Sequence, residues 1–498
     1  MDLFNNLIFG FGVALSLQNL LYCFIGVLVG TLIVVLPGIG PLATIAMLLP
    51  ITYSVPPVAA LIMLAGIYYG AQYGGSTTAI LVNLPGETSS VVTCIDGYQM
   101  ARQGRAGPAL AIAAIGSFFA GTVGTLLIAL FGPPLAEFAL KFGSPEYFSL
   151  MLMGLVAAAA LAQGDLVKSL AMVAVGLLLG IVGNDVNSGV PRFAFGVTEL
   201  LDGIGFIVLA VGVFAIGEII ANLGAAPERR LFASGVTSLM PTREDLRQSW
   251  AAILRGTGVG AFFGVLPGTG PAIASFASYM LEKRIAKDPS RFGQGAIEGV
   301  AGPEAANNAD AQCKFIPMLT LGLPASGVMA LMLGALTMQG IQPGPDVMTQ
   351  RPDLFWGLIA SMWIGNLMLV VLNLPLIGLW VRLLKVPYRL LFPAIMVFSA
   401  IGIYSVNNSA FEIYLTAGFG IFGFILMKLG FPLAPMLLGF VLGPMMEENL
   451  RRSLLLGRGD PSLFLTRPIS LGFLIATVLI LIVVALPGIG KRRADIAG

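Results

Sequence analysis

Four polar, glycine-rich stretches interrupt an otherwise apolar chain, and their residue types are those that bind small charged ligands. They cover residues 36–41, 68–90, 266–271 and 298–327. Non-helical backbone at membrane depth is tolerated only where protein buries it or a cavity wets it. A helix that starts again after a break offers free N–H groups to an anion, and the carbonyls that end the preceding helix favour a cation. The set therefore suits a carboxylate bound together with a small cation.

The two shorter stretches, Leu-Pro-Gly-Ile-Gly-Pro and Leu-Pro-Gly-Thr-Gly-Pro, each predict a helix, an unwound link and a second helix. Pro37 and Pro267 lack the N–H that a helix interior requires. Pro41 and Pro271 instead suit the first position of a new helix. The two breaks are 230 residues apart (267 − 37 = 230), close to half of the chain. Paired interruptions at corresponding positions of two halves indicate the binding site of a transporter.

Two kinds of group in these stretches could contact a ligand: glycine backbone that allows close approach, and neutral side chains that form hydrogen bonds. The predicted substrate-binding residues are Gly38, Gly40, Ser76, Thr77, Asn83, Gly268, Thr269, Gly270, Asn307, Asn308 and Ser326. A cation site is predicted near Pro37, Asn83, Pro267 and Asn308. The competing interpretation is helix packing, because glycine and proline are common in membrane helices, and Asn307-Asn308 could equally form a turn or cap.

The other polar side chains are expected to have ordinary structural roles. Lys314 is expected to extend its charge toward the headgroup region, with direct contact to the carboxylate ligand as the alternative. Asp310 could form a structural i,i+4 pair with Lys314. Glu218 and Glu447 are expected at helix ends in water. Three tyrosines are expected to form part of an interfacial belt: Tyr68, Tyr69 and Tyr73.

The composition places these residues in a membrane. Of 498 residues, 57% are hydrophobic and 10% are charged, and the mean hydropathy is +0.91; soluble domains carry about 25% charged residues. The net charge of +2 gives no reason to expect a nucleic acid partner. The residues before the first apolar segment lack a basic region, so no cleaved signal peptide is expected.

Residue usage also limits the chemistry. The chain has no histidine, which excludes imidazole metal ligation and histidine proton relays, and its three cysteines lack metal-binding spacing. No nucleotide-binding P-loop is present, and no cofactor is expected. Uphill transport would therefore depend on an ion gradient or a partner.

The hydropathy pattern predicts an all-α integral membrane protein with about 11 to 13 transmembrane segments. Spans are expected at 18–36, 55–72, 108–132, 146–163, 167–184, 204–222, 250–266, 325–341, 354–383, 389–406, 412–430, 433–446 and 468–487. Shorter half-membrane segments are expected at 40–53, 75–85, 271–285 and 314–323. The predicted organisation is a first repeat (1–226), a charged linker (227–255), a second repeat (256–452), and a final helix with a basic tail (453–498).

Further correspondences support two structural repeats, each with a broken helix and a helical hairpin. Asn83-Leu84-Pro85-Gly86 is similar to Gly322-Leu323-Pro324-Ala325, at a spacing of 239 (324 − 85 = 239). The repeats would be inverted if each crosses the bilayer an odd number of times.

Several long runs resemble the large membrane subunit of the tripartite tricarboxylate transporters. They are the L-P-G-I-G-P break, Y-Y-G-x-x-Y-G-G-S from Tyr68, N-L-P-G-E, D-G-Y-Q-M-A-R-Q-G-R-A-G-P at Asp96–Pro108, and E-G-V-A-G-P-E-A-A-N-N-A-D from Glu298. The likeness extends to about Arg452. One departure is L-P-A-S at Leu323–Ser326, where the family pattern has L-P-G-S.

The resemblance implies a multi-pass secondary transporter of the bacterial inner membrane that imports carboxylates such as citrate with Na⁺ or H⁺. It also implies two partners, a small membrane subunit and a periplasmic solute-binding protein. A channel is the first alternative and would require a continuous polar path. An intramembrane enzyme is the second, but its candidate acids Asp165, Asp185 and Asp310 are expected at span ends or in polar links.

Overall fold

The computed structural model describes residues 3–35, 40–162, 165–185, 188–223, 240–383 and 388–485. Pro37 and Gly38 of the first break, much of the predicted linker and the basic tail lie outside these residues. Helices make up nearly all of the described fold, as the sequence predicts.

The first half contains α1 (Leu3–Ala14), α2 (Leu17–Val35), α3 (Pro41–Thr52), α4 (Pro57–Val82), η1 (Thr88–Ser90), α5 (Val91–Arg102), α6 (Ala106–Ala139), α7 (Ser144–Leu161), α8 (Leu166–Gly180), β1 (Gly183–Asn184), β2 (Pro191–Arg192), η2 (Thr198–Leu200), α9 (Phe206–Ala210), the π-helical turn η3 (Val211–Ile216) and α10 (Gly217–Leu223). The second half contains α11 (Arg243–Val265), α12 (Pro271–Ile285), η4 (Pro289–Arg291), α13 (Glu298–Cys313), α14 (Phe315–Leu321), α15 (Gly327–Met338), α16 (Val347–Gln350), α17 (Pro352–Asn373), α18 (Ile377–Leu383), α19 (Tyr388–Asn407), α20 (Ala410–Lys428), α21 (Leu433–Leu456), α22 (Leu463–Thr466) and α23 (Pro468–Ala485).

Most predicted spans coincide with helices, and the segment expected at 271–285 is α12. Within the described ranges, five helices are long and apolar enough to cross a membrane: α2, α6, α7, α17 and α20. Six shorter apolar helices accompany them. A membrane architecture is therefore supported, while the larger number of crossings stays a prediction.

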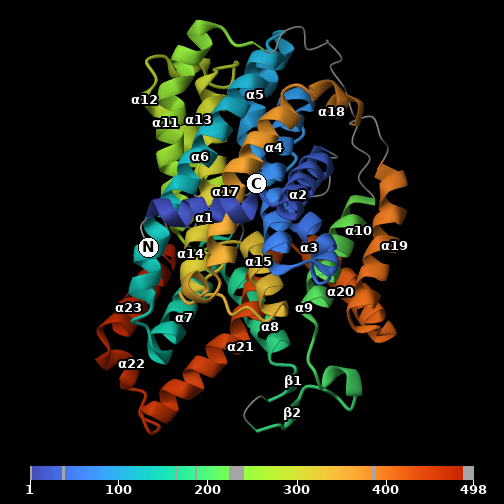
Figure 1. Ribbon diagram of the computed structural model, residues 1–498, viewed down its shortest axis with the longest axis vertical. Coiled ribbons are helices and arrows are strands. Elements are labelled where there is room, and N and C mark those ends of the chain that lie inside the picture. The colour runs from blue at the N-terminus through green and yellow to red at the C-terminus, as the bar shows by residue number, and fades with distance from the viewer. Residues whose placement is uncertain are drawn as a thin grey trace.

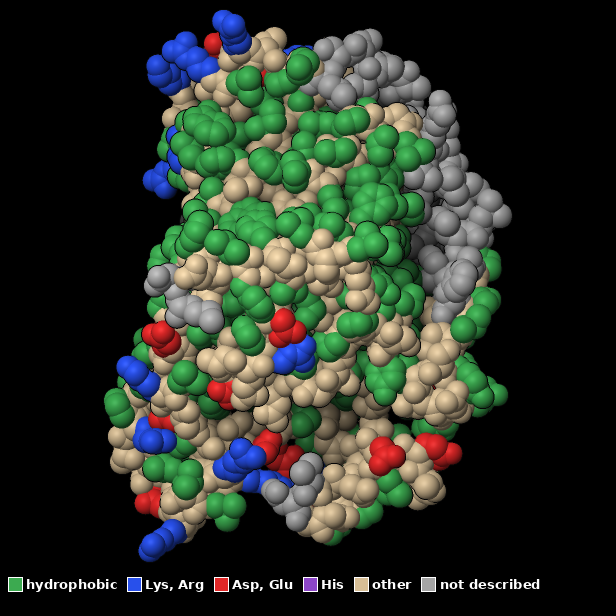
Figure 2. All heavy atoms as spheres, in the orientation of Figure 1, with side chains coloured by type: hydrophobic (Ala, Val, Ile, Leu, Met, Phe, Trp, Pro, Cys, Tyr) green, Lys and Arg blue, Asp and Glu red, His purple; other side chains and the backbone are tan. Residues whose placement is uncertain are grey.

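The helices form an elongated bundle, and α1 runs across its long axis (Figure 1). Helices α5, α11, α12 and α13 gather toward one end, and α21, α22 and the β1–β2 hairpin lie toward the other. Figure 2 shows hydrophobic side chains in a broad band across this face, with charged side chains nearer the two ends. This distribution is the one expected of a protein that faces lipid around its middle.

Glycines bring the helices of each half into backbone contact. A Cβ atom on Gly26 of α2 would lie 2.3 Å from the Met63 carbonyl oxygen of α4. In the second half, a Cβ atom on Gly256 of α11 would lie 2.2 Å from the Gly302 carbonyl oxygen of α13. Such close approach requires residues without a side chain. The packing interpretation is therefore correct for these glycines.

Two of the four polar stretches are helical rather than unwound, contrary to the prediction. Residues 68–78 lie in the interior of α4, which continues to Val82 with no separate segment at 75–85, and residues 298–313 form α13. Glycine inside a helix lowers the stability of that helix, and in α4 close packing offsets this loss. Gly70 and Gly74 lie against the backbone of Val27 and Thr31 in α2.

The polar connection after α8 forms a small hairpin in which β1 pairs antiparallel with β2. Ion pairs tie it to α21: the Arg451 guanidinium lies 2.7 Å from an Asp185 carboxylate oxygen and 2.6 Å from a Glu447 oxygen, and Arg192 lies 2.8 Å from Glu447. Glu447 therefore lies inside α21 in an ion-paired cluster with 26% of its side chain exposed, and the prediction that it ends a helix is wrong.

Candidate functional site

Helices α4 and α13 present polar side chains to one another deep inside the protein. Tyr68, Gln72 and Ser76 recur every four residues along α4, which places them on one face of that helix. All residues of α13 from Gly299 onward are buried, including Glu304, whose side chain faces α4. We call this region the central seam: Tyr68, Gln72, Ser76, Glu87, Ser89, Thr93, Glu304, Asn307, Asn308, Asp310 and Lys314.

Glu304 occupies one end of the central seam, held by two hydroxyl groups. The Ser76 hydroxyl donates to Glu304 Oε2, and the Thr93 hydroxyl of α5 donates to Glu304 Oε1. The residue is 1% exposed, and among the described residues no basic side chain forms an ion pair with it. A buried carboxylate held only by neutral donors is costly in a membrane interior, which marks a functional position.

Glu87 enters the seam from the link between α4 and η1. Its Oε1 accepts a hydrogen bond from the Ser89 hydroxyl and another, at 3.2 Å, from Asn307 Nδ2 of α13. The link folds back over α4, because a Cβ atom on Gly75 would lie 3.0 Å from Glu87 Cγ. The contact between Glu87 and Asn307 thus joins the two halves of the chain.

A buried ion pair lies at the end of α13. The Lys314 ammonium contacts an Asp310 carboxylate oxygen one helical turn away, and both side chains are 0% exposed. The Lys314 charge is also within electrostatic range of Glu87. The prediction that Lys314 reaches the headgroup region is wrong, and the structural i,i+4 pair considered for Asp310 is present. Asp310 lies within α13 rather than at a span end.

Several buried polar atoms in the seam have no hydrogen-bond partner among the described residues. They are Tyr68 Oη, Gln72 Nε2, Asn307 Oδ1 and Asp310 Oδ1. Donors and acceptors are both represented. Two of these groups approach a polar neighbour without hydrogen-bond geometry, Tyr68 near Ser326 and Gln72 near Glu87. Buried polar groups are normally satisfied, so a cluster of unsatisfied ones indicates a place for water, an ion or a substrate. The seam also holds three carboxylates (Glu87, Glu304 and Asp310) against the single Lys314 ammonium, which pairs with Asp310. An anion bound to these donors and acceptors would therefore require a cation or protons to balance the carboxylate charge.

The predicted interfacial tyrosines lie in the core instead. Tyr68, Tyr69 and Tyr73 are 1%, 1% and 4% exposed. Tyr73 donates a 2.7 Å hydrogen bond to Asn366 Oδ1 of α17, which fixes its position beside the seam. Belt residues lie at the end of a span, whereas these three occupy the middle of α4, and the belt prediction is therefore wrong.

The second break is anchored at its glycine. Gly268 has φ +81°, the Gly268 N–H donates to the Ala325 carbonyl at 3.0 Å, and a Cβ atom there would lie 2.4 Å from Ala158 Cα. The Thr269 hydroxyl bonds backward to the Leu266 carbonyl at 2.8 Å. Gly270 is the N-cap of α12 and has open space around it. The unwound link at 322–326 is also present, with Ala325 in place of glycine.

At the first break, the helix N-terminus is contacted by a carboxylate of the protein itself, unlike the open N-terminus at Gly270. Gly40 is the N-cap of α3, and its N–H donates to Glu218 Oε1 at 3.1 Å. The Glu218 carboxylate therefore contacts the partly buried N-terminus of α3, where a negative charge is favoured, instead of lying free in water as predicted. The carboxylate comes from α10, directly after the π-helical turn η3. Gly38 lies outside the described residues.

The structure brings only some of the predicted site residues together. Ser76 and Asn307 lie in the central seam, and Asn308 donates to the Ser117 hydroxyl of α6 at 2.7 Å. Ser326 is the N-cap of α15, with its hydroxyl accepting from the Met329 N–H at 3.3 Å, and it borders Tyr68. Asn83 lies apart, as the exposed, left-handed residue (φ 55°) that ends α4.

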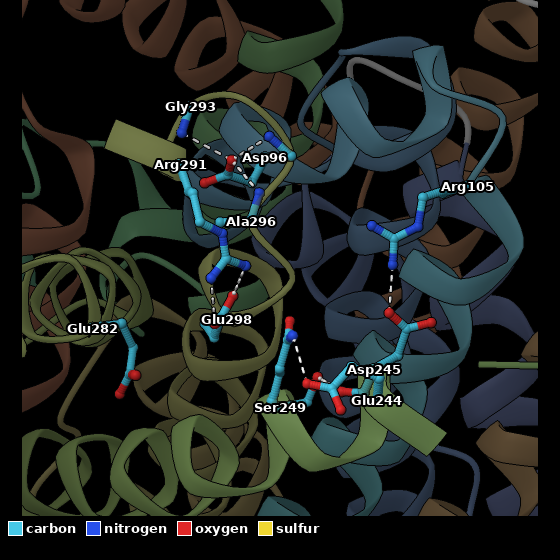
Figure 3. Close-up of polar contacts among 12 residues, drawn as sticks. Asp96, Arg105, Glu244, Asp245, Ser249, Glu282, Arg291, Gly293, Ala296 and Glu298 are labelled. Atoms are coloured by element: carbon cyan, nitrogen blue, oxygen red, sulfur yellow. Dashed lines mark hydrogen bonds and ion pairs between the residues drawn. The ribbon is translucent and has the colours of Figure 1, made fainter. Parts of the chain in front are cut away.

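A separate polar cluster, centred on Asp96 of α5, lies near the end of the molecule where α12 turns into α13 (Figures 1 and 3). Asp96 Oδ1 accepts from the backbone N–H groups of Gly293, Gly295 and Ala296 at 2.7–2.9 Å, and Oδ2 accepts from the Tyr279 hydroxyl at 2.9 Å. Figure 3 also shows Arg291 with Glu298 and Arg105 with Asp245. Both carboxylate oxygens of Asp96 accept hydrogen bonds from the protein, three of them from the backbone of one loop, so this cluster is structural.

Sequence reasoning missed Gln72, Glu87 and Glu304 as site residues. All three lie within the stretches that were selected, but each carries a group that a helix end or loop could expose to water. The usable signal was spacing: Gln72 follows Tyr68 by one helical turn and precedes Ser76 by another. That pattern becomes visible only if 68–78 is taken as a helix.

Comparison with known proteins agrees with this architecture. The description "Tripartite tricarboxylate transporter TctA family" matches residues 20–438. A protein of Agrobacterium vitis, described as an uncharacterized 52.8 kDa protein in the TAR-I ttuC' 3' region, is 59% identical over 493 residues, covering 99% of this chain and 98% of that protein. Another from the same organism, described as an uncharacterized protein in the TAR-II ttuC' 3' region, is 57% identical over 237 residues, covering 48% of this chain and 98% of that protein. No solved structure gives a significant match.

The family match confirms the resemblance drawn from the motifs. With the apolar helices, it identifies a multi-pass membrane protein and a transport subunit, in a family whose members act with partner subunits. The chain belongs to the tripartite tricarboxylate transporter TctA family, as a large membrane subunit.

Proposed function

We propose that this chain imports an organic di- or tricarboxylate across the bacterial inner membrane, driven by a sodium or proton gradient. The observation that carries the proposal is the central seam, where unpartnered donors and acceptors surround a buried lysine between α4 and α13. Lys314 and Gln72 Nε2 would bind a substrate carboxylate, and Asn307 Oδ1 would accept from a substrate hydroxyl. Charge-assisted bonds of this kind are the strong ones.

The proposed substrate site extends from the seam to the breaks. Ser76, Thr77, Asn307, Asn308 and Ser326 would line it, with the α12 N-terminus at Gly268, Thr269 and Gly270 as a second anion contact. At Gly40 the Glu218 carboxylate already occupies the helix N-terminus, so an anionic substrate would have to displace it. The roles of Gly38 and Asn83 stay predictions from the sequence.

We infer a two-fold repeat behind this site. The Gly26–Met63 and Gly256–Gly302 contacts support it. Gly256 follows Gly26 by 230 residues, which is the spacing of the two breaks, and Gly302 follows Met63 by 239 residues, which is the spacing of the two L-P links. By the second spacing Tyr68 corresponds to Asn307, and Glu87 to Ser326. The Asn307–Glu87 contact would then be the counterpart of the Tyr68–Ser326 approach. An inverted arrangement would place the substrate at the interface of the repeats.

The partners in this proposal are a small membrane subunit and a periplasmic solute-binding protein. Family membership supports both, and the binding protein would supply the capture of dilute substrate. High-affinity uptake by this chain alone would contradict the proposal that a separate binding protein captures the substrate.

The test is uptake by vesicles that contain the complete transporter. Radiolabelled di- and tricarboxylates would be supplied with the binding protein under a sodium gradient, a proton gradient or neither. We expect saturable accumulation of at least one acid under one gradient. Conductance without saturation would instead indicate a channel, and absence of carboxylate uptake under every gradient would contradict the proposal.

A further inference from the structure

A small cavity with polar groups on one part of its lining and apolar side chains such as Leu110 and Ile377 on the rest lies beside the central seam, between α4, α6 and the end of α17. Its volume is about 20 Å³, and its polar lining consists of Tyr73, Ser76, Thr77, Ser117 and Asn373. A cavity that admits one water-sized sphere holds a single water molecule or a bare ion of similar size. Each of these side chains is at least nine-tenths buried, so the cavity is internal rather than a surface groove.

The hydrogen atoms of this lining are almost all committed elsewhere. The Ser76 hydroxyl donates to Glu304, the Tyr73 hydroxyl to Asn366 at 2.7 Å, and the Thr77 hydroxyl to the Tyr73 carbonyl at 3.4 Å. Asn373 Nδ2 donates to the Leu369 carbonyl at 2.9 Å. Only the Ser117 hydroxyl, which accepts from Asn308, has no acceptor among the described residues.

The atoms that remain for a ligand are therefore oxygen acceptors. Asn373 Oδ1 is buried without any hydrogen-bond partner in the described chain. The oxygens of Ser76 and Thr77 keep free lone pairs, because a hydroxyl that donates one hydrogen bond can still accept. A cluster of neutral oxygens with few free hydrogens is the lining that a hard cation requires.

Glu304 supplies the neighbouring negative charge. Its carboxylate is one hydrogen bond from the cavity through Ser76, at 2.5 Å, and it forms no ion pair within the described residues. A cation in the cavity would compensate a charge that the bilayer interior otherwise makes costly. Glu304 is the one carboxylate bonded to a side chain of the cavity lining, and Glu87 lies within electrostatic range of it. The described residues contain no grouping of three or more acidic, cysteine or histidine ligands, so we assign a monovalent ion.

We propose that this cavity binds one dehydrated sodium ion, coordinated by Ser76, Thr77, Ser117 and Asn373 and balanced by Glu304. The proposal rests on the proposed function in one respect, because the ion would be the coupling ion of carboxylate import. Ser76 would connect the two events, since it belongs to both the cation cavity and the seam.

Sodium binding is testable on the purified full-length chain without any carboxylate. Thermal unfolding would be followed over a series of NaCl concentrations, with choline chloride and KCl at matched ionic strength. We expect saturable stabilisation specific to sodium, as ligand linkage requires. Absence of a sodium-specific shift in the wild-type chain would overturn the proposal.

Matched variants locate the ion. Thr77→Val removes one coordinating oxygen with little change in volume. The control is Thr320→Val in α14, which removes the same hydroxyl group away from the cavity. The Thr320 hydroxyl, like that of Thr77, donates to the carbonyl four residues earlier, here Ile316 at 2.7 Å. We expect half-maximal stabilisation at a sodium concentration about tenfold higher or more in Thr77→Val, and no shift in Thr320→Val. Equal responses in the two variants would mean that the cavity holds water, and the proposal would be wrong.

Variants at a second position, Asn373, keep the test informative if Thr77→Val fails to fold. Asn373→Ala removes the unpartnered oxygen and should weaken sodium binding, while Asn373→Asp keeps an oxygen, adds charge and should retain binding. Identical sodium responses in both would contradict the site. A chain that binds sodium here but imports no carboxylate would refute only the proposed function, and sodium-independent uptake without sodium binding would refute only this inference.

Discussion

Two buried acidic clusters in this protein differ in how completely they are satisfied. Around Asp96 each carboxylate oxygen accepts hydrogen bonds from named donors, three of them backbone N–H groups. In the central seam, Gln72, Asn307 and Asp310 each retain a polar atom without a partner in the described chain. A satisfied cluster fixes a loop and contributes to stability, whereas an unsatisfied one has capacity left for a ligand. The comparison separates a structural motif from a functional site although the sequence stretches look alike.

The largest expected effect follows from removing the centre of the satisfied cluster. Asp96→Ala would leave three backbone N–H groups and the Tyr279 hydroxyl without an acceptor, so the free energy of unfolding should fall by about 3–5 kcal/mol. Thermal unfolding of the detergent-solubilised chain would measure it. The milder Asp96→Asn variant keeps one acceptor oxygen and should lose less; equal and negligible losses in both would contradict the structural role.

A smaller loss is expected at the second break, with a control two residues away. Gly268→Ala forces an alanine into φ +81° and against Ala158, which should cost about 1–3 kcal/mol of stability and lower the transport rate. Gly270→Ala places its methyl group in open space at φ −80° and should be tolerated. Comparable behaviour of the two variants in unfolding and uptake assays would show that the break geometry does not matter.

The seam side chains should affect binding rather than folding. Asn307→Ala removes the bond to Glu87 and the unpartnered Oδ1, so carboxylate affinity should weaken by about 1.5–3 kcal/mol, roughly ten- to a hundredfold. The Michaelis constant for uptake in vesicles with the complete transporter would report this change. The sequence-based view that neutral groups dominate expects Lys314→Gln to matter less than Asn308→Ala. The proposed contact between Lys314 and the substrate carboxylate instead expects Lys314→Gln to weaken affinity more than Asn307→Ala. A smaller loss in Lys314→Gln would contradict the lysine contact.

The smallest effect is expected at the exposed end of α4. Asn83→Gly removes the side chain and preserves the left-handed backbone at φ 55°, so stability and affinity should change by less than about 0.5 kcal/mol. An affinity loss of tenfold or more would restore Asn83 as a substrate ligand and extend the site beyond the central seam.

The sequence predicted much of the fold because hydropathy and proline placement are local signals. The breaks before Pro41 and Pro271 and the bounds of α12 follow from residue types alone. The helical state of residues 68–78 could not be predicted in the same way. It depends on contacts of Gly70 and Gly74 with α2, which lies more than thirty residues earlier in the chain.

The site was predicted less well, for a related reason. Exposure of Lys314, Glu218 and the α4 tyrosines was inferred from the cost of burying polar groups. That cost is offset by partners far away in sequence, such as Gly40 for Glu218, and by the local pair of Lys314 with Asp310. Cross-repeat contacts such as Asn307 with Glu87 depend on tertiary packing, which no local pattern encodes.

The most direct test of the central claim measures stability and carboxylate affinity together in Gln72→Leu. Leucine replaces a fully buried side chain whose Nε2 has no partner in the described chain. Leucine removes the unsatisfied buried donor together with the 3.3 Å bond that the Ser89 hydroxyl donates to Gln72 Oε1, so we expect an unfolding temperature close to that of wild type. We expect carboxylate affinity at least about tenfold weaker in uptake by the complete transporter. Wild-type affinity in a stably folded Gln72→Leu chain would contradict the account that the central seam binds the substrate.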